Sequence, residues 1–221
     1  MLLSSTISMV VVSVLVLADS VIAGVMLGSD AVAAICLIVP AYSLAAFAGN
    51  MVSLGVPILY NRAMGKFDKE SARQSFAMGL TLSLVMGLFL FVIFMLFGNS
   101  YLEFFGASPE ILALAMSYFF WYKFTILMLP LMVLMLEMVL ADGDEWISTL
   151  AGVVQVVSNI GCSILFCNFM GIAGVSLGSV VGTALAILVT FLHFVRPGNS
   201  LKLGFYFFKE LSCLYFKIQF C

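Results

Sequence analysis

Long stretches without a charged residue dominate the hydropathy pattern of this chain. They cover residues 31–61, 74–102 and 146–195. A helix needs about 20 apolar residues to cross the hydrocarbon core of a bilayer. The first two stretches therefore predict one membrane span each, and the third predicts two. The segment CNFMGIAG, residues 167–174, supplies the expected turn between the two spans of the third stretch.

Two further apolar segments complete a prediction of six spans. Residues 1–18 carry no charge, and residues 111–141 are apolar except for Lys123 and Glu137. A secretory signal peptide is the alternative for the first segment, but nothing basic precedes Arg62, so a retained span is favoured. The expected spans are 2–22, 33–58, 74–97, 111–140, 147–167 and 172–195.

The composition agrees with an all-α integral membrane protein. The chain of 221 residues is 64% hydrophobic and 9% charged, and its mean hydropathy is +1.22. A soluble fold could not bury this much apolar surface. The lipid bilayer is therefore the first expected partner, and a nucleic acid is not expected as a partner.

The distribution of basic residues predicts the topology. The connection 60–73 and the tail 196–221 hold eight of the nine Lys and Arg residues, and the first, third and fifth connections hold none. Basic residues accumulate in short cytoplasmic loops. We therefore expect a multi-pass protein of the plasma (inner) membrane, with both termini cytoplasmic. The eight residues are Arg62, Lys66, Lys69, Arg73, Arg196, Lys202, Lys209 and Lys217.

Enzymatic chemistry finds little support in the sequence. The chain has one histidine and five cysteines without a C-x-x-C pair, so neither a catalytic residue nor a metal site is expected. The segment GVSLG matches G-x-S-x-G, but Ser176 and His193 would lie about 25 Å apart on one helix. Gly174, Gly178 and Gly182 recur every four residues, which favours a face for close helix packing.

Polar residues inside the spans are the candidates for function, because they are costly in a bilayer. Asp19 could couple a proton or Na⁺ to transport, or be a hydrated carboxylate at the interface. Gln155, Asn159 and Ser163 share one helical face, which could hydrogen-bond a neighbouring helix or line an aqueous cavity. The size of the first two side chains favours the cavity. Lys123 must reach the interface, find an acidic partner or face the water of such a cavity.

Two prolines predict local breaks in the spans. Proline has no backbone N–H to donate to the helix, so Pro40 should break the second span and Pro130 the fourth. Neighbouring helices can satisfy the backbone groups that such breaks free, and broken helices recur in transporters.

Four segments, in this order, resemble the multidrug and toxic compound extrusion (MATE) transporters. They are LADSVIAGVMLGSDAVAAICLIVP (17–40), GNMVSLGVPILYNRAMGKFDKESAR (49–73), LADGD (140–144) and NIGCSILFCNFMGIAGVSLGSVVG (159–182). The resemblance covers about residues 17–195. It implies secondary active export of amphipathic, often cationic, organic compounds by alternating access. H⁺ or Na⁺ would be the coupling ion, and no other cofactor is expected.

The resemblance also assigns roles to individual residues. Asp19 matches a residue that takes part in coupling, and Asn159 matches a cavity-facing asparagine. The chain departs from the family at three places. Ser163 stands where many members have an aspartate, Leu140 stands where an arginine is common, and residues 1–18 lack the usual proline. If Asp19 couples transport here, it does so without an acidic neighbour in the fifth span.

Length is the largest departure from the family. Family members have twelve spans in two lobes, whereas residues 1–195 account for the N-terminal lobe, and residues 196–221 are similar to the amphipathic cytoplasmic linker that follows it. The expectation is a partial, truncated transporter whose further partner is a second lobe. A non-transporting remnant or interaction module is the alternative. A lipid-linked precursor flippase is another, for which Lys123 is the one candidate basic residue.

Overall fold

The computed structural model of the chain describes residues 17–195 and Leu201, and every regular element within them is a helix. The described part of the expected first span is the helical segment Leu17–Leu27. The expectations for residues 1–16 and for the linker 196–221, apart from Leu201, lie outside the described residues. The labelled helices are α2 (Ser29–Cys36), α3 (Val39–Gly65), α4 (Lys69–Phe104), α5 (Pro109–Ala141), α6 (Glu145–Met170) and α7 (Ile172–Val195).

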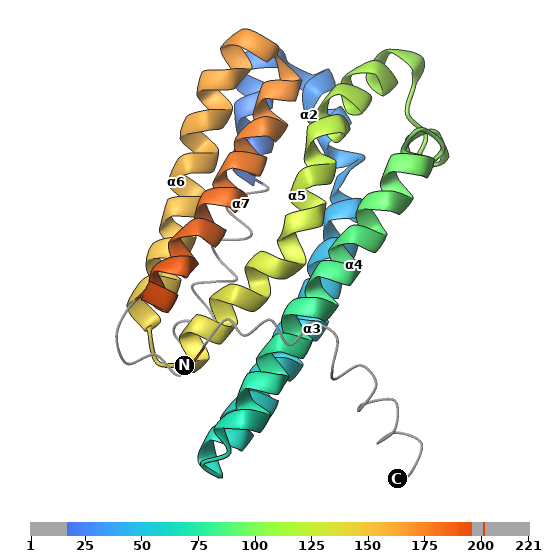
Figure 1. Ribbon diagram of the computed structural model, residues 1–221. Coiled ribbons are helices and arrows are strands. Elements are labelled where there is room, and N and C mark those ends of the chain that lie inside the picture. Colours follow the sequence, from blue (N-terminus) through green and yellow to red (C-terminus); the bar gives the residue numbers. More distant parts are fainter. Residues whose placement is uncertain (1–16, 196–200, 202–221) are drawn as a thin grey trace.

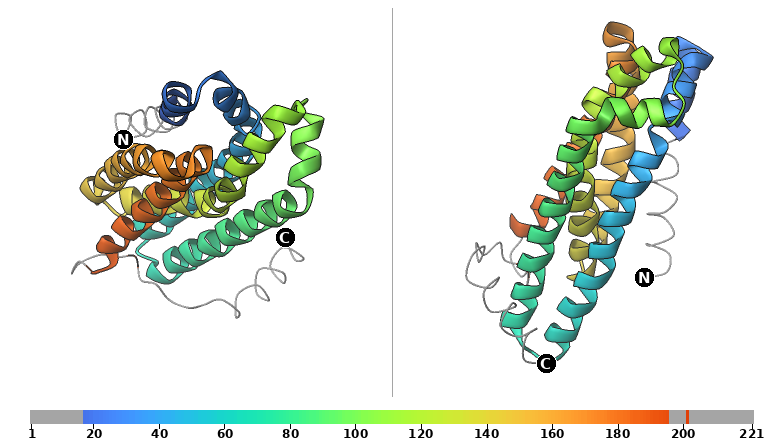
Figure 2. Two further views of the ribbon diagram at one scale, coloured as in Figure 1. Left: turned by 90° about the horizontal axis from the view of Figure 1, so that it is seen from above. Right: turned by 90° about the vertical axis from the view of Figure 1, so that its right-hand side faces the viewer.

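The helices pack side by side as an antiparallel bundle (Figures 1 and 2). With α2 and α3 taken together, five of them are long and apolar enough to cross a membrane. Helix α5 is central, because it contacts every other labelled helix. The α3–α4 turn extends beyond the other helices at one end (Figure 1). We call this end the basic end, because its turn carries Arg62, Lys66, Lys69 and Arg73.

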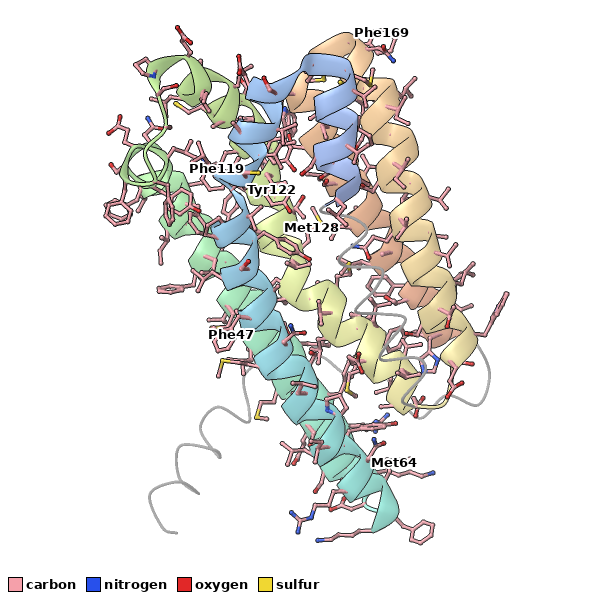
Figure 3. All side chains as sticks on the ribbon, turned by 180° about the vertical axis from the view of Figure 1, so that it is seen from behind. Phe47, Met64, Phe119, Tyr122, Met128 and Phe169 are labelled. Atoms are coloured by element: carbon pink, nitrogen blue, oxygen red, sulfur yellow. The ribbon has the colours of Figure 1, made fainter. Side chains whose placement is uncertain are left out.

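The bundle exposes large apolar side chains on its outer faces, as an integral membrane protein should. Phe47 on α3 is 63% exposed, and Phe169 near the end of α6 is 80% exposed; both point away from the bundle in Figure 3. Contiguous apolar surface of this kind is rare on soluble monomers. A bilayer removes that surface from water, so the outward pattern supports the predicted spans.

The helix ends follow from local side-chain chemistry. Asp68 caps the start of α4, because its carboxylate accepts hydrogen bonds from the Ser71 hydroxyl at 2.6 Å and the Ser71 N–H at 3.1 Å. These bonds hold the pKa of the Asp68 carboxyl below its ordinary value. The turn between α6 and α7 passes through Gly171, whose φ of 59° is a left-handed conformation that glycine adopts without steric penalty.

The second span is broken next to Pro40, as predicted. Helix α2 ends at Cys36, and α3 begins at Val39. Across the break, the N–H of Ala41 donates to the Tyr101 hydroxyl at 3.1 Å, and that hydroxyl donates to the Leu37 carbonyl at 3.0 Å. The Tyr101 side chain from α4 thus replaces a direct helical bond between Ala41 and Leu37.

The predicted break at Pro130 is wrong, because α5 is one helix from Pro109 to Ala141. Helix α3 approaches α5 closely at this proline. A Cβ added to Gly49 would lie 3.1 Å from the Pro130 Cα atom. We attribute the continuity of α5 to this close packing, together with the compatibility of the proline φ angle with a helix.

The glycine face of α7 packs directly against α6. A Cβ at Gly174 would collide with the Phe166 carbonyl, and one at Gly178 would collide with Ser163. A Cβ at Gly182 would lie 2.8 Å from the Gln155 carbonyl oxygen. The three glycines therefore set the distance between the two helices, as small residues do in membrane bundles.

Candidate functional site

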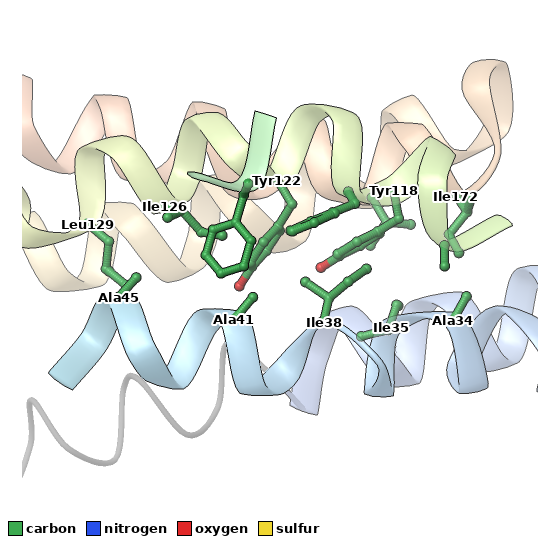
Figure 4. Close-up of a cluster of buried hydrophobic side chains, with 14 of the residues drawn as sticks. Ala34, Ile35, Ile38, Ala41, Ala45, Tyr118, Tyr122, Ile126, Leu129 and Ile172 are labelled. Atoms are coloured by element: carbon green, nitrogen blue, oxygen red, sulfur yellow. The ribbon is translucent and has the colours of Figure 1, made fainter. Parts of the chain in front are cut away.

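A buried carboxylate lies where the helical segment Leu17–Leu27 meets α5 and α7. Asp19 is 4% exposed. Its Oδ2 atom accepts hydrogen bonds from the Tyr118 hydroxyl at 3.0 Å and from the Ser179 hydroxyl at 2.6 Å. Tyr118 projects from α5 toward the helices opposite it in Figure 4. Donors from two helices thus hold one oxygen of the carboxylate.

The hydrogen bonds continue from Asp19 into α6. The Asn159 side-chain N–H donates to the Ser179 oxygen at 2.8 Å, and the Ser179 hydroxyl in turn donates to Asp19. Three buried oxygens near these hydrogen bonds have no hydrogen-bond partner among the described residues: Asp19 Oδ1, Asn159 Oδ1 and Thr125 Oγ1. Buried polar atoms are nearly always hydrogen-bonded, so orphaned oxygens at one place indicate that the site holds a ligand or water.

A small cavity of about 30 Å³ lies beside these groups. A second cavity, of about 10 Å³, separates Asp19 from the break between α2 and α3. A water molecule needs roughly 10–15 Å³ measured in this way, whereas sites for drug-sized molecules occupy about 300–1,000 Å³. The larger cavity therefore suits a water or a small cation. Its lining residues are Asp19, Tyr42, Tyr122, Thr125, Leu129, Met132, Gln155, Asn159, Ser179 and Thr183.

Comparison with protein families decides which class of membrane protein carries this site. A family model described as MatE matches residues 5–165. The chain belongs to the MatE family. No curated relative matches it.

Solved structures of MATE transporters share the fold of this MatE chain. A crystal structure of MATE in the bent conformation matches with a TM-score of 0.83 at 23% identity, over 91% of this chain and 45% of that chain. Two structures of a multidrug resistance MATE family transporter, inward-facing and outward-facing, each match with a TM-score of 0.80 at 21% identity. They cover 85% and 92% of this chain and 43% and 46% of theirs, respectively.

These matches confirm the predicted family and the all-α fold of one lobe of a two-lobe transporter. The chain spans less than half the length of the solved transporters that it matches.

The MatE lobe brings together three of the residues singled out in the sequence. Asp19, Gln155 and Asn159 all line the larger cavity. Ser163 lies one turn further along α6 and lines neither cavity; its hydroxyl donates to the Val175 carbonyl at 3.0 Å beneath Gly178. The polar face of the fifth span is thus divided between the cavity and helix packing.

Lys123 also lies outside both cavities. The Lys123 side chain projects from α5 toward α4. Its ammonium lies 5.2 Å from the centroid of the Phe119 ring, which is on α5 one turn earlier. A Cβ added to Gly98 on α4 would lie 3.3 Å from the same nitrogen. The side chain therefore occupies space left by a glycine and makes a cation–π contact. Of the positions that the sequence left open for Lys123, the one facing a cavity is therefore not found at either of these two cavities.

Sequence reasoning missed the partners of Asp19. Ser179 directly follows Gly178 on α7, in a segment whose glycines predict helix packing and no polar contact. Tyr118, Tyr122 and Thr125 follow one another at steps of four and three residues on α5. That helical spacing of hydroxyl groups within an apolar span was the signal that could have identified them.

Proposed function

We propose that this chain is the cation-coupling lobe of a secondary active antiporter that exports amphipathic, cationic organic compounds. Asp19 would bind the coupling ion, H⁺ or Na⁺. The observation that carries the proposal is the unpartnered Oδ1 atom of this buried carboxylate beside a small polar cavity. We place the lobe in the plasma (inner) membrane with its basic end facing the cytoplasm.

Charge burial supports a cation at this site. An ionised carboxylate removed from water costs several kcal/mol unless a positive charge or enough hydrogen bonds compensate it. Tyr118 and Ser179 supply two donors to one oxygen and leave the other without a partner. A proton on Asp19 would neutralise the group. Alternatively, Na⁺ could be held by the unpartnered oxygens of Asp19, Asn159 and Thr125, since hard cations prefer oxygen ligands.

The cavity volume separates ion binding from substrate binding. A cavity of about 30 Å³ is too small for an organic substrate. The exported compound must then bind outside this cavity, and we propose a surface shared with a second lobe. The relative lengths support this assignment, because the matched transporters are more than twice as long as the part of them that this chain covers.

The residues around Asp19 could transmit ion binding to the helices. Ser179 receives a hydrogen bond from Asn159 on α6 and donates one to Asp19, while Tyr118 on α5 donates to the same oxygen. Neutralising the carboxylate weakens both bonds to it, since hydrogen bonds to charged groups are the stronger ones. The contacts of the first helical segment with α5 and α7 would then differ between the loaded and empty states.

The test is dye efflux from membrane vesicles that hold the chain in a transport-competent assembly. Asp19→Asn should abolish efflux driven by a pH or Na⁺ gradient, and comparing the two gradients identifies the ion. Asp30→Asn is the matched control, because Asp30 is an exposed carboxylate whose side chain accepts a hydrogen bond from the adjacent Ser29. Unchanged efflux in Asp19→Asn would remove this residue from the mechanism. Absence of efflux in every assembly would overturn the transport proposal.

The alternatives from the sequence receive less support. An interaction module using the glycine face of α7 would need that face to be accessible, but Gly174, Gly178 and Gly182 lie against α6. A lipid-linked precursor flippase would need basic residues in its cavity, and Lys123 lines neither cavity described above. Transport coupled at Asp19 therefore explains more of the buried polar groups around the larger cavity than either alternative does.

A further inference from the structure

A second buried polar cluster lies at the basic end, apart from the Asp19 site. His193, on the last turn of α7, is 1% exposed. Its Nδ1 atom lies 2.5 Å from Asp144 Oδ2, and its Nε2 atom lies 2.9 Å from Asp142 Oδ2. It is the single histidine of the chain. Both ring nitrogens therefore face carboxylate oxygens at hydrogen-bond distance.

The cluster joins several parts of the bundle. Asp142 follows the last residue of α5, and Asp144 precedes the first residue of α6. From α3, the Tyr60 hydroxyl donates a hydrogen bond to Asp142 Oδ1. The Leu201 N–H donates to Asp142 Oδ2 at 3.4 Å. The end of α7 is thus tied to the α5–α6 turn, and through that turn to α3.

Within the described residues, groups from three other parts of the bundle lie around His193. The titratable groups that face His193 are Asp142 and Asp144 from the α5–α6 turn, with Tyr60 from α3 behind Asp142. From α4, Phe76 stacks on the neighbouring Phe194 at a centroid distance of 6.0 Å. That contact is apolar. Among the groups that the structure describes, the imidazole thus contacts two carboxylates and the Phe194 ring.

The geometry of the imidazole implies a bound proton. A neutral imidazole carries one N–H and one lone pair, whereas an imidazolium donates from both nitrogens. An ionised carboxylate only accepts, so a lone pair facing it makes no hydrogen bond and is repelled. Two short contacts to two carboxylates therefore require one additional proton. It resides on His193 or is shared with one of the aspartates.

We propose that His193, Asp142 and Asp144 form a second proton-binding site, at the basic end of the lobe. Its bound proton holds the end of α7 against the α5–α6 turn. Release of that proton to water leaves one ring nitrogen facing a carboxylate without a hydrogen atom between them. The contact to that aspartate is then lost, and the end of α7 separates from the turn.

The cluster shares helix α7 with the Asp19 site. His193 follows Ser179, the donor to Asp19, by 14 residues on one uninterrupted helix. The two positions are about 21 Å apart along the helix axis. A proton at His193 and a cation at Asp19 would therefore act on two separate positions of the same helix, its last turn and its first half. The second site does not depend on Asp19 binding the coupling ion.

The single histidine makes the bound proton directly observable. In the full chain, labelled with ¹⁵N-histidine and reconstituted in lipid nanodiscs, solid-state NMR reports whether each ring nitrogen carries hydrogen. From the two contacts to carboxylates, we expect both nitrogens to be protonated or in a strong shared hydrogen bond. Asp144→Asn should convert the ring to a neutral tautomer, because an amide can donate to the ring lone pair. Glu145→Gln is the matched control, one residue away and exposed.

The two NMR outcomes decide the proton assignment. A neutral tautomer in the wild-type chain, with one nitrogen free of hydrogen bonding and unchanged in Asp142→Asn and Asp144→Asn, would overturn the proposal. A protonated ring that becomes neutral in these variants and stays protonated in Glu145→Gln supports it.

A distance measurement tests whether the proton ties the helix. Spin labels replace Val195 on α7, 83% exposed, and Leu59 on α3, 46% exposed. We expect one narrow distance distribution in acid, where the proton stays bound, and a broader, longer one in alkali, where it is released. His193→Gln should give the broad distribution at both pH values. Identical narrow distributions in the wild-type chain and in His193→Gln at both pH values would refute the proposal that the proton holds the end of α7 against the turn. Neither measurement needs transport, so a failed efflux assay leaves both interpretable.

Discussion

The contact between α6 and α7 makes Gly178 a sensitive position. A Cβ at Gly178 would overlap the Ser163 side-chain oxygen and approach the Ser163 backbone. Backbone atoms cannot move aside as a flexible side chain can, so Gly178→Ala must push the helices apart. We expect Gly178→Ala to destabilise the lobe even though alanine is the better helix former.

The size of the effect follows from three contributions. Overpacking a tight contact costs about 1–3 kcal/mol. Displacing the Ser163 hydroxyl breaks its 3.0 Å bond to the Val175 carbonyl, which contributes about 1 kcal/mol. Replacing glycine by alanine inside a helix returns about 1 kcal/mol. The expected net loss in the free energy of unfolding is therefore about 1–3 kcal/mol.

A matched substitution isolates the contact. Gly152 lies on α6, and a Cβ there would meet no atom within 4 Å. Gly152→Ala should therefore gain stability, by at most about 1 kcal/mol. Chemical unfolding of both variants in mixed micelles, followed by circular dichroism, gives the two free energies. Ser163→Gly in the Gly178→Ala background removes the hydroxyl clash but leaves the backbone clash, so it should restore only part of the loss. Equal stability of Gly178→Ala and Gly152→Ala would refute the reasoning.

Two further predictions concern local hydrogen bonds. Tyr101→Phe removes the hydroxyl between Ala41 and Leu37 but keeps the ring. It should lower the free energy of unfolding by about 1–3 kcal/mol, because two backbone groups lose their hydrogen-bond partner. An unchanged unfolding curve would contradict this. Asp68→Ala should lower the melting temperature at neutral pH. Because Ser71 depresses the Asp68 pKa, the stabilisation is present above about pH 4 and disappears as pH falls through the folded-state value. The wild-type and variant melting temperatures should therefore converge in acid, and a constant difference down to low pH would exclude the cap.

The two prolines show how far local chemistry predicts a span. Each lacks an N–H, and the sequence treats them alike. At Pro40 the second span is broken, and a tyrosine that is sixty-one residues away in the chain bridges the break. At Pro130 the helix continues, with Gly49 of α3 packed against it. The difference lies in the neighbouring helices, which a local pattern does not contain.

The polar residues of the spans show a similar division. Asp19 could be identified from the sequence because a carboxylate in an apolar span is costly wherever its neighbours lie. Its donors, Tyr118 and Ser179, are hydroxyls on two other helices, and hydroxyls are common enough in membrane helices to carry little signal by themselves. Lys123 is equally easy to identify in the sequence, but its side chain faces α4 and not the cavity. Helix packing decides which side of α5 faces the cavity, and the sequence pattern does not contain that information.

By itself, the sequence determined that the chain is a helical membrane protein, where most of its spans lie and which family it resembles. Those features depend on apolar length, charge spacing and short motifs, all of which are local along the chain. The tertiary structure decided which polar groups meet. It placed Asp19 beside Ser179 in the first half of α7, and His193 between Asp142 and Asp144 at the end of that helix. These contacts between distant residues depend on the rotation and crossing of whole helices. Close glycine contacts, such as that of Gly178 with Ser163, fix how the helices pack.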